Sequence, residues 1–168
     1  MHSRIYKIQP DFAKPFEKIE EDTFYDNGFL DGYHDYVSDD TDWAEDYQWL
    51  SGSSFGDAFV VGIDGEMENP LGESPEKVPV YYLEVDLEEA FKLLKEKQEE
   101  LIRQVSGDTI DAFSYNARKL IVGDTSGFYF YCEGEYMTDV DFLLYLITAH
   151  GKSGTAKFRL EGSLDYHS

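Results

Sequence analysis

Three kinds of side chain in this sequence could do chemistry: one cysteine, four histidines and 35 carboxylates. Cys132 lies in the segment FYFYCEGEY, whose alternation places it on the same face of a strand as Phe128 and Phe130. A cysteine on such a face is typical of a small buried hydrophobe. No basic neighbour is present to lower the pKa of its thiol, so catalysis by Cys132 is disfavoured.

The histidines and the paired glutamates give no stronger motif. His34 lies close to Asp31 and Asp35 in the sequence, but no HxxxH or CxxC spacing supports a zinc site. We therefore expect His34 to be a surface histidine beside acids. Glu133 and Glu135 could form an acid–base pair, but the solvent face of an antiparallel strand is a much better explanation of them. The sequence predicts no catalytic residue, no metal site and no cofactor.

The acids themselves are concentrated in one part of the chain. Residues 21–46 hold ten acidic residues and no Lys or Arg. The run 40–46 lacks the glycine and the ligand spacing of an EF-hand loop, so a dedicated calcium site is not indicated. Over the whole chain, 35 acids against 14 bases give a net charge of −21. Such a protein is repelled by nucleic acid and by anionic membranes, and its natural partners are basic surfaces.

Part of the acidic segment has a regular spacing. Asp31, Asp35 and Asp39 are four residues apart, so a helix would align them in a stripe with a pitch of about 6 Å. A rigid row of carboxylates at this pitch is a crude copy of a phosphate strand in duplex DNA. The predicted partner-binding residues are Asp26, Asp31, Asp35, Asp39, Asp40, Asp42, Glu45 and Asp46.

These observations favour a non-enzymatic acidic protein that binds a basic protein surface. Its specific form is a nucleic-acid mimic that inhibits a DNA- or RNA-binding protein or a nuclease, in anti-restriction or anti-CRISPR style. An immunity-type protein that neutralises a basic toxin has the same sequence features, and so does a domain whose acidity serves only solubility. An enzyme with a dispersed active site is a further alternative. It would show a deep pocket lined by carboxylates with shifted pKa values.

The elements that must position these residues follow from hydrophobic periodicity. We expect one α+β domain over residues 1–168, with a mostly antiparallel sheet of about five to seven strands backed by about four helices. An acidic helical segment at 21–50 follows the first strand, and residues 64–77 form an exposed loop. The expected strands are 3–8, an interior strand at 57–63, 78–85 and 154–162, with a hairpin over 118–137 that turns at 124–127. The last strand alternates, with Ala156, Phe158 and Leu160 on one face and Lys157, Arg159 and Glu161 on the other. Residues 109–115 fit a strand or a turn of helix equally.

Four helices are expected. The first spans about 28–38, and the second spans 42–50 with Thr41 as its N-cap and one buried face. The third begins at Asp86 and carries an apolar stripe to residue 105. The fourth, capped by Thr138, runs to residue 150 and turns its apolar side inward. The inward residues expected there are Val140, Leu143, Leu144 and Ile147.

Location and assembly are less constrained. The segment MHSRIYKIQP lacks the long apolar region of a signal peptide, and no run approaches the roughly 18 apolar residues of a membrane helix. We therefore expect a cytoplasmic protein without membrane contact. The oligomeric state stays open.

Overall fold

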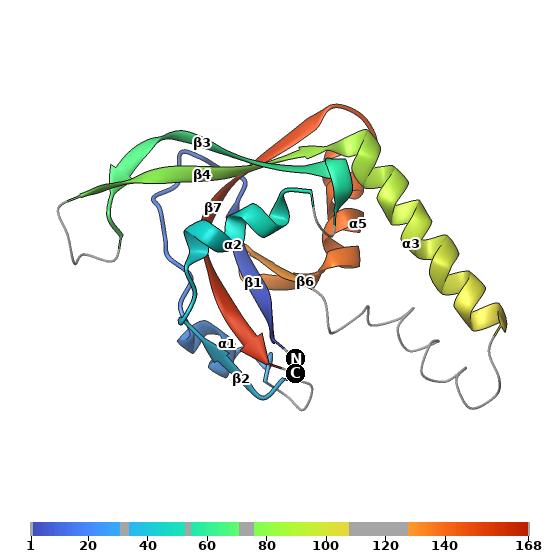
Figure 1. Cartoon of the computed structure of the whole chain (residues 1–168), viewed down its shortest axis with the longest axis horizontal. Coiled ribbons are helices and arrows are strands. Elements are labelled where there is room, and N and C mark those ends of the chain that lie inside the picture. The colour runs from blue at the N-terminus through green and yellow to red at the C-terminus, as the bar shows by residue number, and fades with distance from the viewer. Residues whose placement is uncertain (1, 31–33, 53–54, 71–75, 108–127, 168) are drawn as a thin grey trace.

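The sheet is organised around its longest strand, β7 (Thr155–His167), which pairs with three other strands (Figure 1). The structure is a computed structural model that describes residues 2–30, 34–52, 55–70, 76–107 and 128–167. These residues form one α+β domain, in which a mixed, mostly antiparallel sheet of seven strands packs with four α-helices. The predicted fold class is confirmed.

The strand order is β3-β4-β7-β1-β5-β6, and β2 pairs with β7 beside this path. β1 and β5 are parallel, whereas the other paired strands are antiparallel. The remaining strands are β1 (His2–Gln9), β2 (Tyr36–Ser38), β3 (Phe59–Glu68), β4 (Lys77–Asp86), β5 (Tyr129–Cys132) and β6 (Glu135–Thr138). The helices are α1 (Asp22–Asp26), α2 (Trp43–Leu50), the 3₁₀ turn η1 (Gly56–Ala58), α3 (Leu87–Gly107) and α5 (Asp139–His150).

A bulge at Gly162 changes the direction of the side chains along β7. The register between β1 and β7 shifts at this point, and Gly162 has φ +110°, a conformation that favours glycine. Ala156, Phe158 and Leu160 therefore pack into one core cluster, whereas the later even-numbered residues Leu164 and Tyr166 pack into another. The predicted alternation is confirmed up to Leu160.

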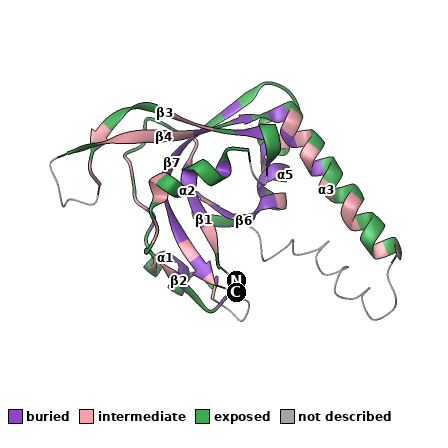
Figure 2. Cartoon of the chain, in the orientation of Figure 1, coloured by how far each residue is buried: buried purple, intermediate pink, exposed green. Residues whose placement is uncertain are grey.

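Each face of the sheet carries its own core cluster (Figure 2). The larger cluster joins β1, β4, β5 and β7 to buried residues of α2, α3 and α5. The smaller cluster joins the other face of β1, β5 and β7 to residues of segment 19–37, which contains α1 and β2. Both faces of the sheet are apolar and must be covered. The aromatic residues of the acidic segment cover one of them, and they hold this segment to the domain, as the sequence predicts.

The segment before α1 is fastened to the sheet by a buried arginine. Arg159 donates hydrogen bonds to the carbonyl oxygens of Phe12, Lys14 and Pro15, and its guanidinium pairs with the fully buried Glu161. The planar guanidinium has enough donors to satisfy all four acceptors. Arg159 and Glu161 were expected on a polar face of β7, and the structure places that face beneath a covering segment.

The helix predicted over 28–38 is wrong. Residues 36–38 form β2, which pairs with the end of β7, and Asp35 donates its backbone N–H to the carbonyl of His167. Upstream, the side chain of Asn27 accepts a hydrogen bond from the N–H of Phe29, and Gly28 has φ +81°. A free strand edge on β7 offers backbone hydrogen bonds that outweigh the weak helix propensity of a glycine-containing segment.

Residues 57–68 also differ from the expectation. β3 is an edge strand, not an interior one, and it continues through residues assigned to the exposed loop 64–77. Gly65 (φ +82°), which the sequence assigned to this loop, lies in a bulge between Ile63 and Glu66. A glycine at positive φ serves both a turn and a bulge, so the sequence alone does not separate them.

The other helices are mostly as predicted. α2 has the expected buried face, but its N-cap is Asp42, whose carboxylate accepts from the N–H groups of Ala44 and Glu45. Thr41, the expected cap, instead donates to the carbonyl of Ser163 at 3.0 Å. Asp86 caps α3 as predicted.

Thr138 caps α5 as expected, and its reciprocal hydrogen bonds with Asp141 form a capping box. Leu143 is buried, and Val140 and Ile147 pack against the larger core cluster, as predicted. Phe142 and Leu146 are also buried, although they were not among the predicted inward residues. Leu144 is 51% exposed, so its predicted inward position is wrong. The face that contacts the sheet is centred about one residue away from the expected one.

The segment FYFYCEGEYM is a hairpin by itself. β5 and β6 are joined by Glu133 and Gly134, both at positive φ (50° and 93°), as a two-residue type I′ turn requires. The expected single strand over this segment is therefore wrong, and Glu135 belongs to β6. The turn predicted at 124–127 lies outside the described residues, as does the segment 109–115.

The bulge at Gly162 generates a stability prediction. Its N–H donates to the buried hydroxyl of Tyr47 at 2.6 Å. Tyr47→Phe leaves this N–H without its partner, so we expect the free energy of unfolding to fall by about 1–3 kcal/mol. Tyr25→Phe is the matched control, because its hydroxyl bonds the carbonyl of Val37 from a side chain that is 52% exposed. Equal losses in urea unfolding would contradict the structural role of Tyr47.

Candidate functional site

An open cleft of about 540 Å³ lies where the chain passes from β2 into α2. Its lining consists of Lys18, Asp39, Asp40, Thr41, Asp42 and Trp43. Three carboxylates, one ammonium and an indole ring therefore share one concave surface. Carboxylates beside an aromatic wall suit a cationic group, which gains both charge attraction and contact with the ring face.

Hydrogen bonds from several elements fix the acidic rim. The N–H of Asp39 donates to the carboxylate of Glu21, and the Asp39 carboxylate pairs with Lys18. Asp42 is held as the N-cap of α2. Thr41, between them, is tied to β7 through Ser163. The carboxylates are thus presented by a backbone that is fastened at both ends of this short connection.

The aromatic wall is part of the hydrophobic core. The ring of Trp43 packs edge-on against Tyr47 at 5.4 Å and Tyr81 at 5.9 Å between centroids. Trp43 is only partly buried, and it is one of the residues that line the cleft. The sequence assigned Trp43 to the buried face of its helix, and nothing in the spacing indicated that it also lines a surface.

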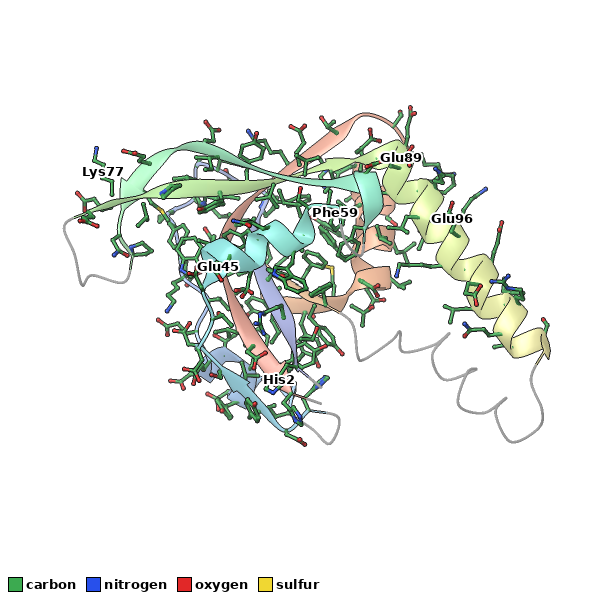
Figure 3. The ribbon with its side chains drawn as sticks, in the orientation of Figure 1. His2, Glu45, Phe59, Lys77, Glu89 and Glu96 are labelled. Carbon is green, nitrogen blue, oxygen red and sulfur yellow. The ribbon has the colours of Figure 1, made fainter. Side chains whose placement is uncertain are left out.

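The charge around the cleft is unbalanced. Asp40, Asp42 and Glu45 are all exposed. Within the described ranges, none of the three has an ion pair with a basic side chain. Figure 3 shows Glu45 at the end of α2 that is close to the cleft, and many oxygen-tipped side chains surround this side of the domain. The cleft therefore lies in a field that attracts cations.

The eight predicted partner-binding residues have different environments. Asp39, Asp40 and Asp42 line the cleft together, and Glu45 follows on the first turn of α2. Asp26 is exposed at the end of α1. Asp35 pairs with His167 at 2.7 Å, and Asp31 lies outside the described residues. Because residues 36–38 form a strand, the expected helical row of Asp31, Asp35 and Asp39 is not present.

Asp46 has a structural environment. It is 8% exposed, and its carboxylate accepts from Arg4 at 2.9 Å and from Ser163 at 3.0 Å. Its backbone carbonyl also accepts from the hydroxyl of Tyr6. These bonds connect α2 to β1 and β7, so Asp46 helps to position the helix that carries the exposed acids.

A second cavity of about 240 Å³ lies beside the segment 17–23 and includes Lys7, Glu17 and Tyr131 in its lining. The Lys7 ammonium donates to both the carbonyl and the carboxylate of Glu17. This hydrogen bond and the positive charge lower the pKa of Glu17. A general acid needs a raised pKa, so the pair Lys7–Glu17 acts as an ion pair that closes this segment over the sheet.

His34 is not on the surface, which corrects the expectation. It is 8% exposed, its ring stacks on Phe29 with centroids 4.2 Å apart, and its Nε2 lies 3.3 Å from the hydroxyl of Tyr129. The aromatic residues of the smaller core cluster surround it. Within the described parts of the chain, no group of three or more His, Cys, Asp or Glu side chains could hold a metal ion.

The chain has no match among the proteins with which it was compared. A scan against protein-family models, a search of curated proteins and a search of solved structures each found nothing similar. Of the helices in the described ranges, none combines the length and the apolar character that crossing a membrane requires.

The first prediction concerns the reactivity of Cys132 on β5. Burial beside the larger core raises the pKa of its thiol to about 11. At pH 8 only about one thiol in a thousand is then ionised, and the thiolate is the reactive form. We expect an aromatic disulfide reagent to modify the native protein at least about 100-fold more slowly than the urea-unfolded protein. Fast modification without unfolding would show that Cys132 is accessible and activated.

A second prediction compares the buried Asp46 with the exposed Asp40. Asp46→Ala removes the acceptor of Arg4 and Ser163, so we expect it to lower the free energy of unfolding by about 2 kcal/mol. Asp40→Ala, which removes an exposed carboxylate, should change it by less than about 0.5 kcal/mol. Urea unfolding measures both. Similar losses for the two variants would contradict the division of roles.

Proposed function

We propose that this chain is a non-enzymatic acidic protein that binds a basic surface of a partner protein. The observation that supports this proposal is the cleft at 39–43, where exposed carboxylates and Trp43 stand on a fixed backbone. Lysine and arginine side chains fit this lining, because they combine a positive charge with an apolar stem that can lie against the indole.

The excess of acid supports the same proposal. A net charge of −21 is well beyond the roughly 2–8 units that solubility of a small domain requires. The surplus also destabilises the compact state through self-repulsion. Long-range attraction would speed association with a basic partner and would weaken as salt is added.

We propose specifically that the partner is a DNA- or RNA-binding protein or a nuclease, whose basic cleft this protein occupies and inhibits as a nucleic-acid mimic. The location in this proposal is the cytoplasm. What supports mimicry is the density of exposed carboxylates around residues 39–45. A straight row of carboxylates at helical pitch does not contribute, since residues 36–38 are a strand.

The test is a variant in which Asp40→Asn, Asp42→Asn and Glu45→Gln are combined. Asparagine is as good an N-cap as aspartate, so α2 should keep its start. If each charge contributes about 0.5 kcal/mol to partner binding, affinity should fall roughly tenfold. The measurement is retention of basic proteins from lysate at low salt, followed by stepped elution and competition with DNA.

The matched control removes the same number of charges elsewhere. It combines Glu96→Gln, Glu99→Gln and Glu135→Gln, which change exposed residues of α3 and β6. This control should retain the partner nearly as well as the parent protein. Equal weakening by both variants would mean that only bulk charge matters. A retained basic protein that DNA does not displace would contradict mimicry and indicate a toxin or another basic partner.

A further inference from the structure

The free edge of β3 is the longest unpaired strand edge in the described part of the chain. β3 pairs with β4 along residues 59–68 and lies at the end of the strand order. No other described strand pairs with its outer side, and Figure 1 shows β3 at the outside of the hairpin. Every second residue of such a strand directs its N–H and C=O groups away from the sheet, where another strand can bind them.

The two halves of this edge differ in how well they are protected against pairing with another strand. From Asp64 to Glu68 the strand contains a bulge at Gly65 and three acids, which are features that prevent edge-to-edge association. From Phe59 to Ile63 it contains no charge, and it is rich in residues that favour strands. The side chains of Val60 and Ile63 are 53% and 61% exposed. The first half is therefore open to pairing.

Charge determines which strand can bind there. A second copy would bring a protein of net charge −21 against itself, and its own acidic half-edge would lie near that of its partner. Glu66 and Glu68 are exposed beside the open half, and so is Asp64, which lies 3.4 Å from the ammonium of Lys157. A segment with Lys or Arg at alternate positions would place positive charges where these carboxylates lie.

The open half-edge is connected to the acidic cleft. Ile63 is the cross-strand partner of Tyr81, and the Tyr81 ring contacts Trp43, which lines the cleft. Cross-strand partners share one face of the sheet, so Ile63, Tyr81 and Trp43 form a continuous path on the side covered by α2. One partner can therefore engage both the edge and the cleft.

We propose that the edge of β3 at residues 59–63 binds an extended basic segment of the partner as an added strand. This inference rests on the proposed function and specifies how the basic partner is held. Backbone hydrogen bonds to the edge supply affinity, and basic side chains that meet the neighbouring acids supply selectivity. The edge then gives the partner a fixed register that diffuse charge attraction lacks.

The probe is an acetylated and amidated octapeptide of alternating lysine and valine. Its control is the same sequence methylated at every backbone nitrogen, which keeps the charges and side chains but has no N–H donors. We expect the first peptide to bind at least about tenfold more tightly at low salt. Binding should also slow exchange of the outward amide hydrogens in residues 59–63 at least about tenfold, as measured by NMR.

Two results from the peptides would overturn the added strand. If the methylated peptide binds as tightly as its parent, attraction is purely ionic, and the proposal of an acidic partner-binding surface still stands. If the first peptide binds but leaves the amides of residues 59–63 unchanged, the edge is not the contact.

Protein variants test the same edge from the other side. Val60→Lys combined with Ile63→Lys places positive charges on the open half and should weaken binding of the lysine–valine peptide at least about tenfold. The control, Ile102→Lys with Leu144→Lys, makes the same change at exposed positions of α3 and α5 and should leave binding unchanged. Equal weakening by both pairs would overturn the assignment. Sedimentation at high salt tests whether the edge binds a second copy of the chain instead. A dimer that is lost in the Val60→Lys variant would assign the edge to a second copy and would overturn the proposal of a basic partner strand.

Discussion

The bulge at Gly162 is the constraint on which the rest of the structure depends. Glycine accommodates φ +110° at this point, and a side chain would also meet Ile19, since an added Cβ would lie 3.1 Å from its Cγ2. The N–H of the bulged residue is directed into the core, where the Tyr47 hydroxyl accepts it. Burial raises the pKa of Tyr47 well above its usual value, so the hydroxyl stays neutral.

The bulge lets one strand serve both faces of the sheet. Before Gly162, β7 buries Phe158 and Leu160 against the α-helical side, and after it Leu164 and Tyr166 face the side on which Ile19, Phe24 and Phe29 pack. Ser163 is thereby turned toward α2, where it bonds Asp46 and accepts from Thr41. The acids of the cleft are consequently positioned by contacts to a strand more than 100 residues away in the sequence.

Much of the fold could be predicted from local patterns. Strands 3–8 and 78–85 and the N-caps at Asp86 and Thr138 were all evident because their hydrophobic periodicity and their caps lie within a few residues. The cleft was predicted only in part. Asp39, Asp40 and Asp42 were identified by charge, whereas Lys18 and Trp43 join them through tertiary packing that no spacing indicates.

Three of the differences from the predicted structure have one physical cause, which is contact with distant residues. The segment 28–38 has helical spacing, but its end pairs with β7, and Asp64-Gly65 forms a bulge because β4 continues beside it. His34 has acidic neighbours in sequence and aromatic neighbours in space. Local sequence does not include these partners.

The sequence by itself determined that this protein is an acidic α+β domain with an aromatic core. Composition and hydrophobic periodicity are properties of the chain that do not depend on its long-range contacts. Only the tertiary structure decided which of its acids stay exposed and unpaired in the described part of the chain. Arg4 and Lys18 form ion pairs with Asp46 and Asp39, and His167 contacts Asp35 at 2.7 Å, all from remote positions in the sequence. Asp40, Asp42 and Glu45 remain exposed. Charge is a property of the chain, but the pairing of charges depends on distances that only the folded backbone sets.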